Sequence, residues 1–210
     1  MTSKLAREAA DLLGEPLRSA DTLQPGGLSQ VLLAHFASGR AAVVKNGPFP
    51  RAEAAMLQAI LAAGAPAPEV LAASEDVLVL ERLPEGGALT PKGAAELGAA
   101  LARLHGVAGD QYGWAEDYAF GAVRIRNLFS DDWPRFWAEN RRLSEADRLP
   151  VDLARRLEMA ATRLAEILPA KPFPSLWHGD LWSGNVLAHQ GTLSGLIDPA
   201  AYYGHGELDL

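Results

Sequence analysis

Three polar side chains near the end of the 210-residue sequence have types and spacing suited to chemistry on a phosphate. Asp180 and Asn185 stand five positions apart in His178-Gly-Asp-Leu-Trp-Ser-Gly-Asn185, and Asp198 follows an apolar run. Phosphoryl transfer needs a carboxylate that accepts the proton of the attacking hydroxyl, and oxygen ligands that hold Mg²⁺ against the phosphates. These residues therefore predict phosphoryl transfer, with Asp180 as the proton acceptor.

The spacing supports the same interpretation. In kinases with a His-x-Asp-x-x-x-x-Asn loop, the Asp orients the substrate hydroxyl, the Asn binds one metal ion, and an Asp beyond the next hairpin also binds metal. The segment from Asn185 to Asp198 reads as such a hairpin, turning at Gln190-Gly191. We expect Asn185 and Asp198 to bind Mg²⁺. A solvated His-Gly-Asp turn is the alternative for the triplet alone, but it would not explain the other two residues.

A lysine at the end of an apolar strand is a second candidate for contact with phosphates. Ala41-Ala-Val-Val-Lys45 resembles the Val-Ala-Ile-Lys of kinases, in which the ammonium group contacts nucleotide phosphates and is held by a helix glutamate. Glu53 in the next predicted helix is the candidate partner. A lone lysine at a strand end is more often a surface residue, but the three downstream residues favour the functional interpretation of Lys45.

Two weaker signals complete the expected nucleotide site. Gly26 and Gly27 precede the first apolar strand, where backbone amides could lie over phosphates. They match neither common glycine-rich nucleotide motif, so this assignment rests on position alone. Glu81 and Leu83 follow the apolar run 77–80, where a nucleotide base would meet a hinge between two lobes.

Hydrophobic patterning divides the chain into a nucleotide-binding lobe, 1–83, and a mostly helical lobe with the catalytic loop, 84–210. The first lobe is predicted to hold a small sheet, and its expected helices and strands are 5–13, 30–36, 41–45, 51–63, 70–71 and 77–80. In the second lobe we expect a helix from Pro91 to near His105, a loop over 112–127, a helix after Asp131 or Asp132 through Leu143, and another over 153–167. A hairpin with an acid at each end follows.

Composition excludes several classes of protein. The absence of cysteine rules out disulfides, thiolate-bound metals and a cysteine nucleophile, and the five histidines lack close metal-binding spacing. The formal net charge is −7 and the basic residues are scattered, so nucleic acid is not an expected partner. No run is long and apolar enough for a membrane span, and the beginning of the chain lacks a secretory signal pattern. We expect a cytoplasmic protein with small-molecule partners.

The motifs also resemble a known family. His178-Gly-Asp-Leu-Trp-Ser-Gly-Asn-Val186 and Ile197-Asp-Pro-Ala-Ala-Tyr-Tyr-Gly-His205 are close to the signatures of the fructosamine kinases, or ketosamine kinases. These are relatives of the aminoglycoside phosphotransferases and choline kinases. The resemblance implies an α+β, bilobal protein-kinase-like fold, with a small antiparallel sheet in the N-lobe and a mostly helical C-lobe.

The resemblance further implies a function. ATP would phosphorylate the 3-hydroxyl of a sugar attached to an amine, a ketosamine or glycated amine, and the labile product would reverse glycation. Asp180 would be the base, Asn185 and Asp198 would hold Mg²⁺, and Lys45 with Glu53 would position the phosphates. The residues implied to face the sugar are Trp182, Tyr203 and His205.

Three departures from the family keep alternatives open. Gly206 stands where the family has an arginine, Arg124-Ile-Arg-Asn127 replaces Pro-Gln-x-Asn, and the family continues for several helices beyond the position of Leu210. We therefore expect uncovered apolar surface on the second lobe, through which association is possible; the oligomeric state stays open. A catalytically impaired nucleotide-binding module is one alternative. An aminoglycoside- or choline-type phosphotransferase and a metal-dependent hydrolase using His178, Asp180 and Asp198 are weaker ones.

Overall fold

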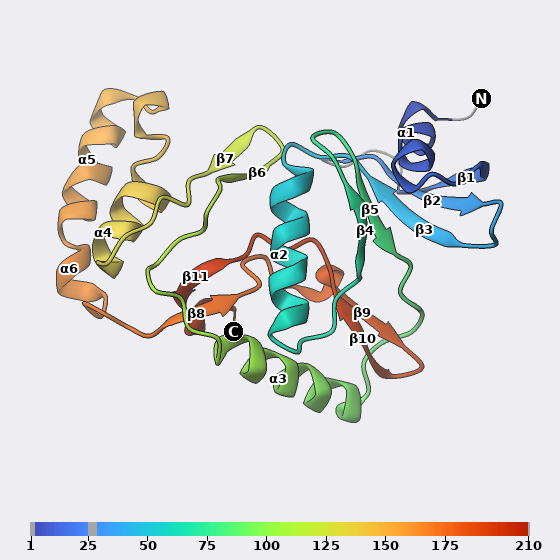
Figure 1. The fold of residues 1–210 in the computed structure, drawn as a ribbon. Coiled ribbons are helices and arrows are strands. Elements are labelled where there is room, and N and C mark those ends of the chain that lie inside the picture. Colours follow the sequence, from blue (N-terminus) through green and yellow to red (C-terminus); the bar gives the residue numbers. More distant parts are fainter. Residues whose placement is uncertain (1–2, 25–28, 210) are drawn as a thin grey trace.

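A five-stranded antiparallel sheet organises the N-terminal part of the protein, whose computed structural model describes residues 3–24 and 29–209. The strands lie in the order β1-β2-β3-β5-β4 (Figure 1). Their bounds are β1 (Leu17–Gln24), β2 (Val31–Phe36), β3 (Ala41–Lys45), β4 (Val70–Ala73) and β5 (Leu78–Glu81). The sequence patterns indicate all of these except β1, an edge strand with no buried residue over 17–23 and hence no apolar alternation.

Two helices cover the sheet. α1 (Lys4–Leu13) packs Leu5 and Ala9 against the apolar face that includes Phe36. α2 (Pro50–Ala62) packs against the other face and lies at the centre of the molecule (Figure 1). Its apolar side chains share one core with residues of the C-terminal part, so α2 ties the two halves of the chain together.

The C-terminal part combines helices with three short hairpins or strand pairs. The helices are α3 (Pro91–His105), α4 (Trp133–Trp137), α5 (Val151–Thr162) and α6 (Leu164–Ile167). The antiparallel pairs are β6 (Tyr118–Phe120) with β7 (Val123–Ile125), β8 (Pro174–Trp177) with β11 (Tyr202–His205), and β9 (Val186–His189) with β10 (Thr192–Leu196). The result is the mixed fold expected, with helices and short strands following an antiparallel sheet.

One local prediction was wrong, and two helices were predicted in nearly the right place but differ in geometry. The segment expected as a loop over 112–127 contains the β6–β7 hairpin, whose three-residue strands are too short to show a period. The helix capped by Asp132 changes after Trp137 to a π-helical segment, Ala138–Arg142. The helix expected over 153–167 is broken at Arg163 into α5 and α6.

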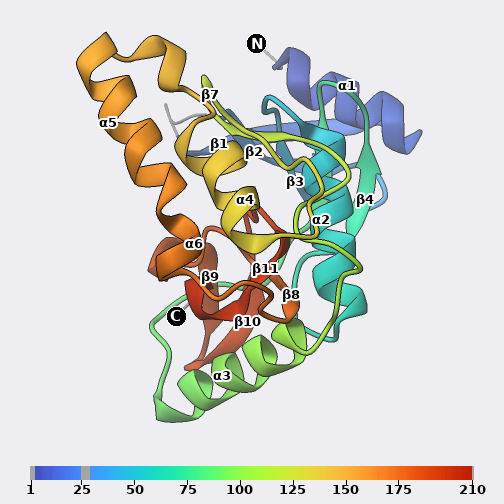
Figure 2. The same cartoon turned by 90° about the vertical axis from the view of Figure 1, so that its left-hand side faces the viewer.

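The outer helices leave apolar side chains uncovered. α5 and α6 lie on the outside of the C-terminal part, next to α4 (Figure 2). Only Ala161 of α5 is buried, whereas Val151 is 86% and Ile167 69% exposed. Apolar side chains of α5 and α6 are therefore exposed on the surface of the structure.

The start of α3 is fixed to the tip of the β9–β10 hairpin. The Thr90 backbone amide and hydroxyl both donate to the Gly191 carbonyl, at 3.0 and 2.7 Å. Gly93 lies so close that a Cβ placed on it would be 2.3 Å from the Gly191 oxygen. A glycine is therefore needed where the helix meets the hairpin that leads to Asp198.

We predict opposite effects for alanine at the two glycines inside α3. Gly93→Ala should lower the free energy of unfolding by about 1–3 kcal/mol, because the methyl group overpacks the contact with Gly191. Gly98→Ala, at an exposed position with open space around it, should raise it by about 0.5–1 kcal/mol through helix propensity. Urea unfolding of both variants measures this, and equal stability of the two would contradict the proposed packing.

Candidate active site

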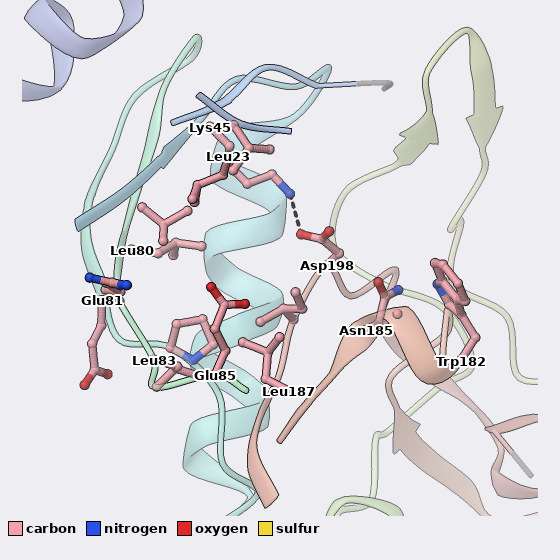
Figure 3. Close-up of a pocket in the computed structure, with 16 residues that line it drawn as sticks. Leu23, Lys45, Leu80, Glu81, Leu83, Glu85, Trp182, Asn185, Leu187 and Asp198 are labelled. Carbon is pink, nitrogen blue, oxygen red and sulfur yellow. Dashed lines mark hydrogen bonds and ion pairs between the residues drawn. The ribbon is translucent and has the colours of Figure 1, made fainter. Parts of the chain in front are cut away.

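A buried lysine lies at the centre of the site. Lys45, the last residue of β3, is 2.9 Å from Glu53 on α2 and 2.6 Å from Asp198 beyond β10 (Nζ to Oε1 and Oδ1, respectively). Figure 3 shows the lysine and Asp198 pointing toward one another across the cavity. The Lys45 and Glu53 side chains are 9% and 4% exposed, whereas that of Asp198 is 49% exposed.

The two carboxylates control the charge of this lysine. Burial alone would lower the pKa of Lys45, because it penalises the charged form. Glu53 and Asp198 outweigh that effect, and the pKa of Lys45 is raised above its ordinary value. The ammonium group is therefore charged at neutral pH and suited to contact anionic phosphates.

The loop that follows β8 presents Asp180 beside Asn185. The Asn185 side-chain amide donates to the Asp180 carbonyl oxygen at 2.8 Å and to its carboxylate Oδ2 at 3.0 Å. Gly179 has φ +82°, and a Cβ there would lie 2.1 Å from the Ala200 carbonyl oxygen. The tight turn of the His-Gly-Asp segment thus depends on glycine and sets the direction of Asp180.

Asp209 supports this loop from behind, a role that the sequence analysis missed. Its buried carboxylate accepts the backbone amides of His178 and Gly179, at 2.7 and 3.0 Å. Its Oδ2 is also 3.1 Å from Nε2 of His105, at the end of α3. One side chain therefore fixes two successive amides of the loop, and no local sequence pattern indicates this long-range contact.

The β9–β10 hairpin carries the chain from Asn185 to Asp198. Its two-residue turn, Gln190-Gly191, has φ +50° and +83°, the positive values that a type I′ turn requires. The sequence-based turn prediction is confirmed. Asp198 itself has φ +54°, uncommon for a residue other than glycine, and this conformation directs its carboxylate toward Lys45.

A cavity of about 390 Å³ opens beside the lysine between the sheet and the hairpin. Lys45, Asn185 and Asp198 line one end, and Glu81 and Leu83 line the other (Figure 3). Apolar side chains missed by the sequence analysis form much of the remaining wall: Leu23, Val31, Val43, Leu80, Leu187 and Ile197. The arrangement is a slot with apolar walls, which we call the apolar slot, and Lys45, Asn185 and Asp198 form one polar end of it. Arg82 and Glu85 also line the slot.

A second cavity, of about 310 Å³, adjoins the same charged groups from the other side. Asp180 lines it together with Lys45, Asn185 and Asp198. The aromatic rings of Phe120, from β6, and Trp182 contribute to its wall. Asp180 thus faces a pocket that is distinct from the apolar slot but shares its polar end.

Comparison with known proteins agrees with this geometry. Residues 43–210 match the sequence profile of the fructosamine kinase family. A candidate ketoamine kinase of Enterococcus faecium is 36% identical over 122 residues, which are 55% of this chain and 44% of that protein. The chain belongs to the fructosamine kinase family.

Solved structures show the same fold. The structure of a candidate fructosamine-3-kinase from Thermobifida fusca has a TM-score of 0.85 and 28% identity, covering 98% of this chain and 76% of the other. An aminoglycoside phosphotransferase in complex with ADP and hygromycin B has a TM-score of 0.69 and 16% identity, covering 99% of this chain and 75% of that one, and shows the fold alone. The expected kinase-like fold is confirmed.

The structure does not bring every expected site residue of this family member together. Tyr203 and His205 lie on β11, which pairs with β8, and neither lines the cavity that contains Asp180. Tyr203 stacks instead on Trp114, with ring centroids 5.8 Å apart. Gly26 and Gly27 lie outside the described residues, so their expected phosphate contacts stay a prediction.

The polar end of the slot fits a magnesium ion. Because the Asn185 amide nitrogen donates to Asp180, its carbonyl oxygen is the atom suited to a metal, and Asp198 adds a carboxylate. Mg²⁺ prefers oxygen ligands and completes its shell with water and substrate phosphates. In the described part of the chain no three His, Cys, Asp or Glu residues gather as a metal site, and none of the described helices could cross a membrane.

We predict that His178 makes the folded protein sensitive to acid. Burial lowers the pKa of this histidine, against an opposing effect of Asp209. Between the lowered and ordinary values the unfolded chain binds a proton that the folded chain does not, so stability falls as the pH drops through about 6.5. Below that pH, the free energy of unfolding should fall less steeply in His178→Gln than in the wild type. The two slopes should differ by up to about 1.4 kcal/mol per pH unit. Urea unfolding from pH 7.5 to 5 measures both slopes, and identical slopes would refute the prediction.

Proposed function

We propose that this protein transfers the γ-phosphoryl group of ATP to a sugar hydroxyl of a ketosamine. The observation that carries the proposal is the meeting of two cavities at one set of polar residues, Lys45, Asn185 and Asp198, with Asp180 facing only the second cavity. Membership of the fructosamine kinase family supports the substrate class. The match covers only 44% of the length of the E. faecium relative. The activity of the whole protein is therefore a proposal.

In this proposal the apolar slot takes ATP. The adenine ring lies among the apolar side chains, close to the backbone at Glu81 and Leu83, and the phosphates extend toward Lys45. The ammonium group, held by Glu53, neutralises phosphate charge. Mg²⁺ bound by Asn185 and Asp198 would neutralise the charge that develops on the transferred group.

The second cavity takes the acceptor. Asp180 accepts the proton of the sugar hydroxyl as that oxygen forms a bond to the γ-phosphorus. The bond between the γ-phosphorus and the β–γ bridging oxygen breaks, and ADP leaves with its electron pair. Trp182, 60% exposed, and Phe120 offer apolar faces against which a sugar ring can lie.

The alternatives account for less of the site. An impaired nucleotide-binding module was suggested by Gly206, but the loop has support from Asp209, which accepts its two amides. A hydrolase using His178 as a metal ligand conflicts with the complete burial of that side chain.

The direct test is phosphate transfer from labelled ATP to fructosyl-lysine in the presence of Mg²⁺. We expect a phosphorylated sugar and stoichiometric ADP. Hygromycin B and choline serve as competing acceptors of other classes. The proposal would be refuted if stoichiometric amounts of enzyme transferred no phosphate to fructosyl-lysine or to another ketosamine.

We predict that Asp180→Asn separates chemistry from nucleotide binding. The substitution removes the proton acceptor but leaves Lys45 and Asp198 in place, so turnover should fall by about 10²–10⁴-fold while nucleotide affinity changes little. Asp152→Asn, an exposed aspartate on α5, is the matched control and should keep wild-type turnover. Steady-state kinetics and calorimetric titration with ADP measure the two quantities. An active Asp180→Asn protein would exclude Asp180 as the base.

A further inference from the structure

A tyrosine from the C-terminal part reaches into the lysine site. Tyr118 lies on β6, in the hairpin between α3 and α4, and its hydroxyl donates to Oε2 of Glu53 on α2 at 3.1 Å. Both side chains are buried, Tyr118 with 7% and Glu53 with 3% exposure. The Tyr118 ring is set between Phe49 and Phe120, with centroids 6.5 and 6.2 Å away. The hydroxyl is therefore held in place by packing as well as by its hydrogen bond.

Glu53 divides its two oxygens between Tyr118 and the lysine. Oε1 accepts from Lys45 at 2.9 Å while Oε2 accepts from Tyr118. A carboxylate with both oxygens engaged has one orientation, and removal of one buried partner leaves the other oxygen without its bond. Burial and the neighbouring Glu53 carboxylate raise the pKa of Tyr118, so the hydroxyl keeps its proton and acts as a donor. In this hydrogen bond the Tyr118 hydroxyl is the donor and Glu53 the acceptor.

The same tyrosine also faces the acceptor cavity. Tyr118 lines the 310 Å³ cavity together with Asp180, whereas it does not line the apolar slot. Glu53 and Lys45 connect it to the slot within two hydrogen bonds. A residue of the acceptor side therefore holds the group that orients the nucleotide lysine.

We propose that Tyr118 is a positioning residue that fixes Glu53, and through it Lys45, for contact with the nucleotide phosphates. This inference rests on the proposed function, since it assigns a role in nucleotide binding. In this proposal Tyr118, which does not line the apolar slot, acts on the nucleotide phosphates through Glu53 and not by direct contact. Its effect must therefore depend on the presence of Lys45.

The test compares nucleotide affinity in Tyr118→Phe and wild type. Phenylalanine keeps the ring packing and removes the hydroxyl. Calorimetric titration with Mg²⁺ and a non-hydrolysable ATP analogue should show that the affinity is weakened by roughly five- to twentyfold. This loss corresponds to part of the free energy of a hydrogen bond to a charged group. Tyr112→Phe is the matched control, because Tyr112 is also buried but donates to the Pro172 carbonyl at 2.6 Å. It should change the unfolding midpoint and leave nucleotide affinity at the wild-type value.

A double-mutant comparison separates positioning from a general structural effect. On a Lys45→Met background, Tyr118→Phe should cause no further loss of affinity, since the lysine through which it acts is gone. The inference is overturned if Tyr118→Phe binds the nucleotide with wild-type affinity. It is also overturned if Tyr118→Phe lowers the affinity equally in the presence of Lys45 and in the Lys45→Met protein. Absence of nucleotide binding by the wild type would instead overturn the proposed function, so the two failures are distinct.

Discussion

The site depends on the buried charge of one lysine. Removal of an ammonium group from water costs several kcal/mol unless opposite charges compensate for it at close range. Lys45 obtains that compensation from Glu53, eight residues away, and from Asp198, 153 residues away. The sheet, the helix that packs on it and the distant hairpin must all be in place before the charge is satisfied. The folding of the C-terminal part is therefore linked to the electrostatics of the N-terminal sheet.

Hydrogen bonds from polar side chains to backbone atoms hold the distant groups in place. The tip of the β9–β10 hairpin is bonded to Thr90 at the start of α3, and the His-Gly-Asp turn is bonded to Asp209. Each contact saturates polar backbone atoms that would be costly to bury unpaired. The start of the segment from Asp180 to Asp198 and the hairpin tip in its middle are thus restrained, which helps two acids and an amide converge on one point.

Local sequence signals predicted most of the helices and strands but not the long-range contacts between side chains. Ala41–Lys45, the Gln190-Gly191 turn and the Asp132 cap each depend on a few adjacent residues, so their patterns can be read directly. Tyr118 and Glu53 are 65 residues apart, and no periodicity joins them. The resemblance alone assigns Tyr203 to the sugar, whereas its backbone bridge to Gly113 places its ring against Trp114.

The unequal exposure of the two acids around Lys45 explains how one site can serve both a lysine and a metal ion. Glu53 is buried with both oxygens bonded, so a change of partner would leave a desolvated carboxylate unpaired. The Asp198 side chain is about half exposed and can exchange the ammonium group for another cation while remaining solvated. Three carboxylates, Glu53, Asp180 and Asp198, line one cavity with a single lysine, and two of them contact it. In the proposed complex a polyphosphate would add negative charge to that surplus, and a divalent cation beside Asp198 and Asn185 would compensate for it.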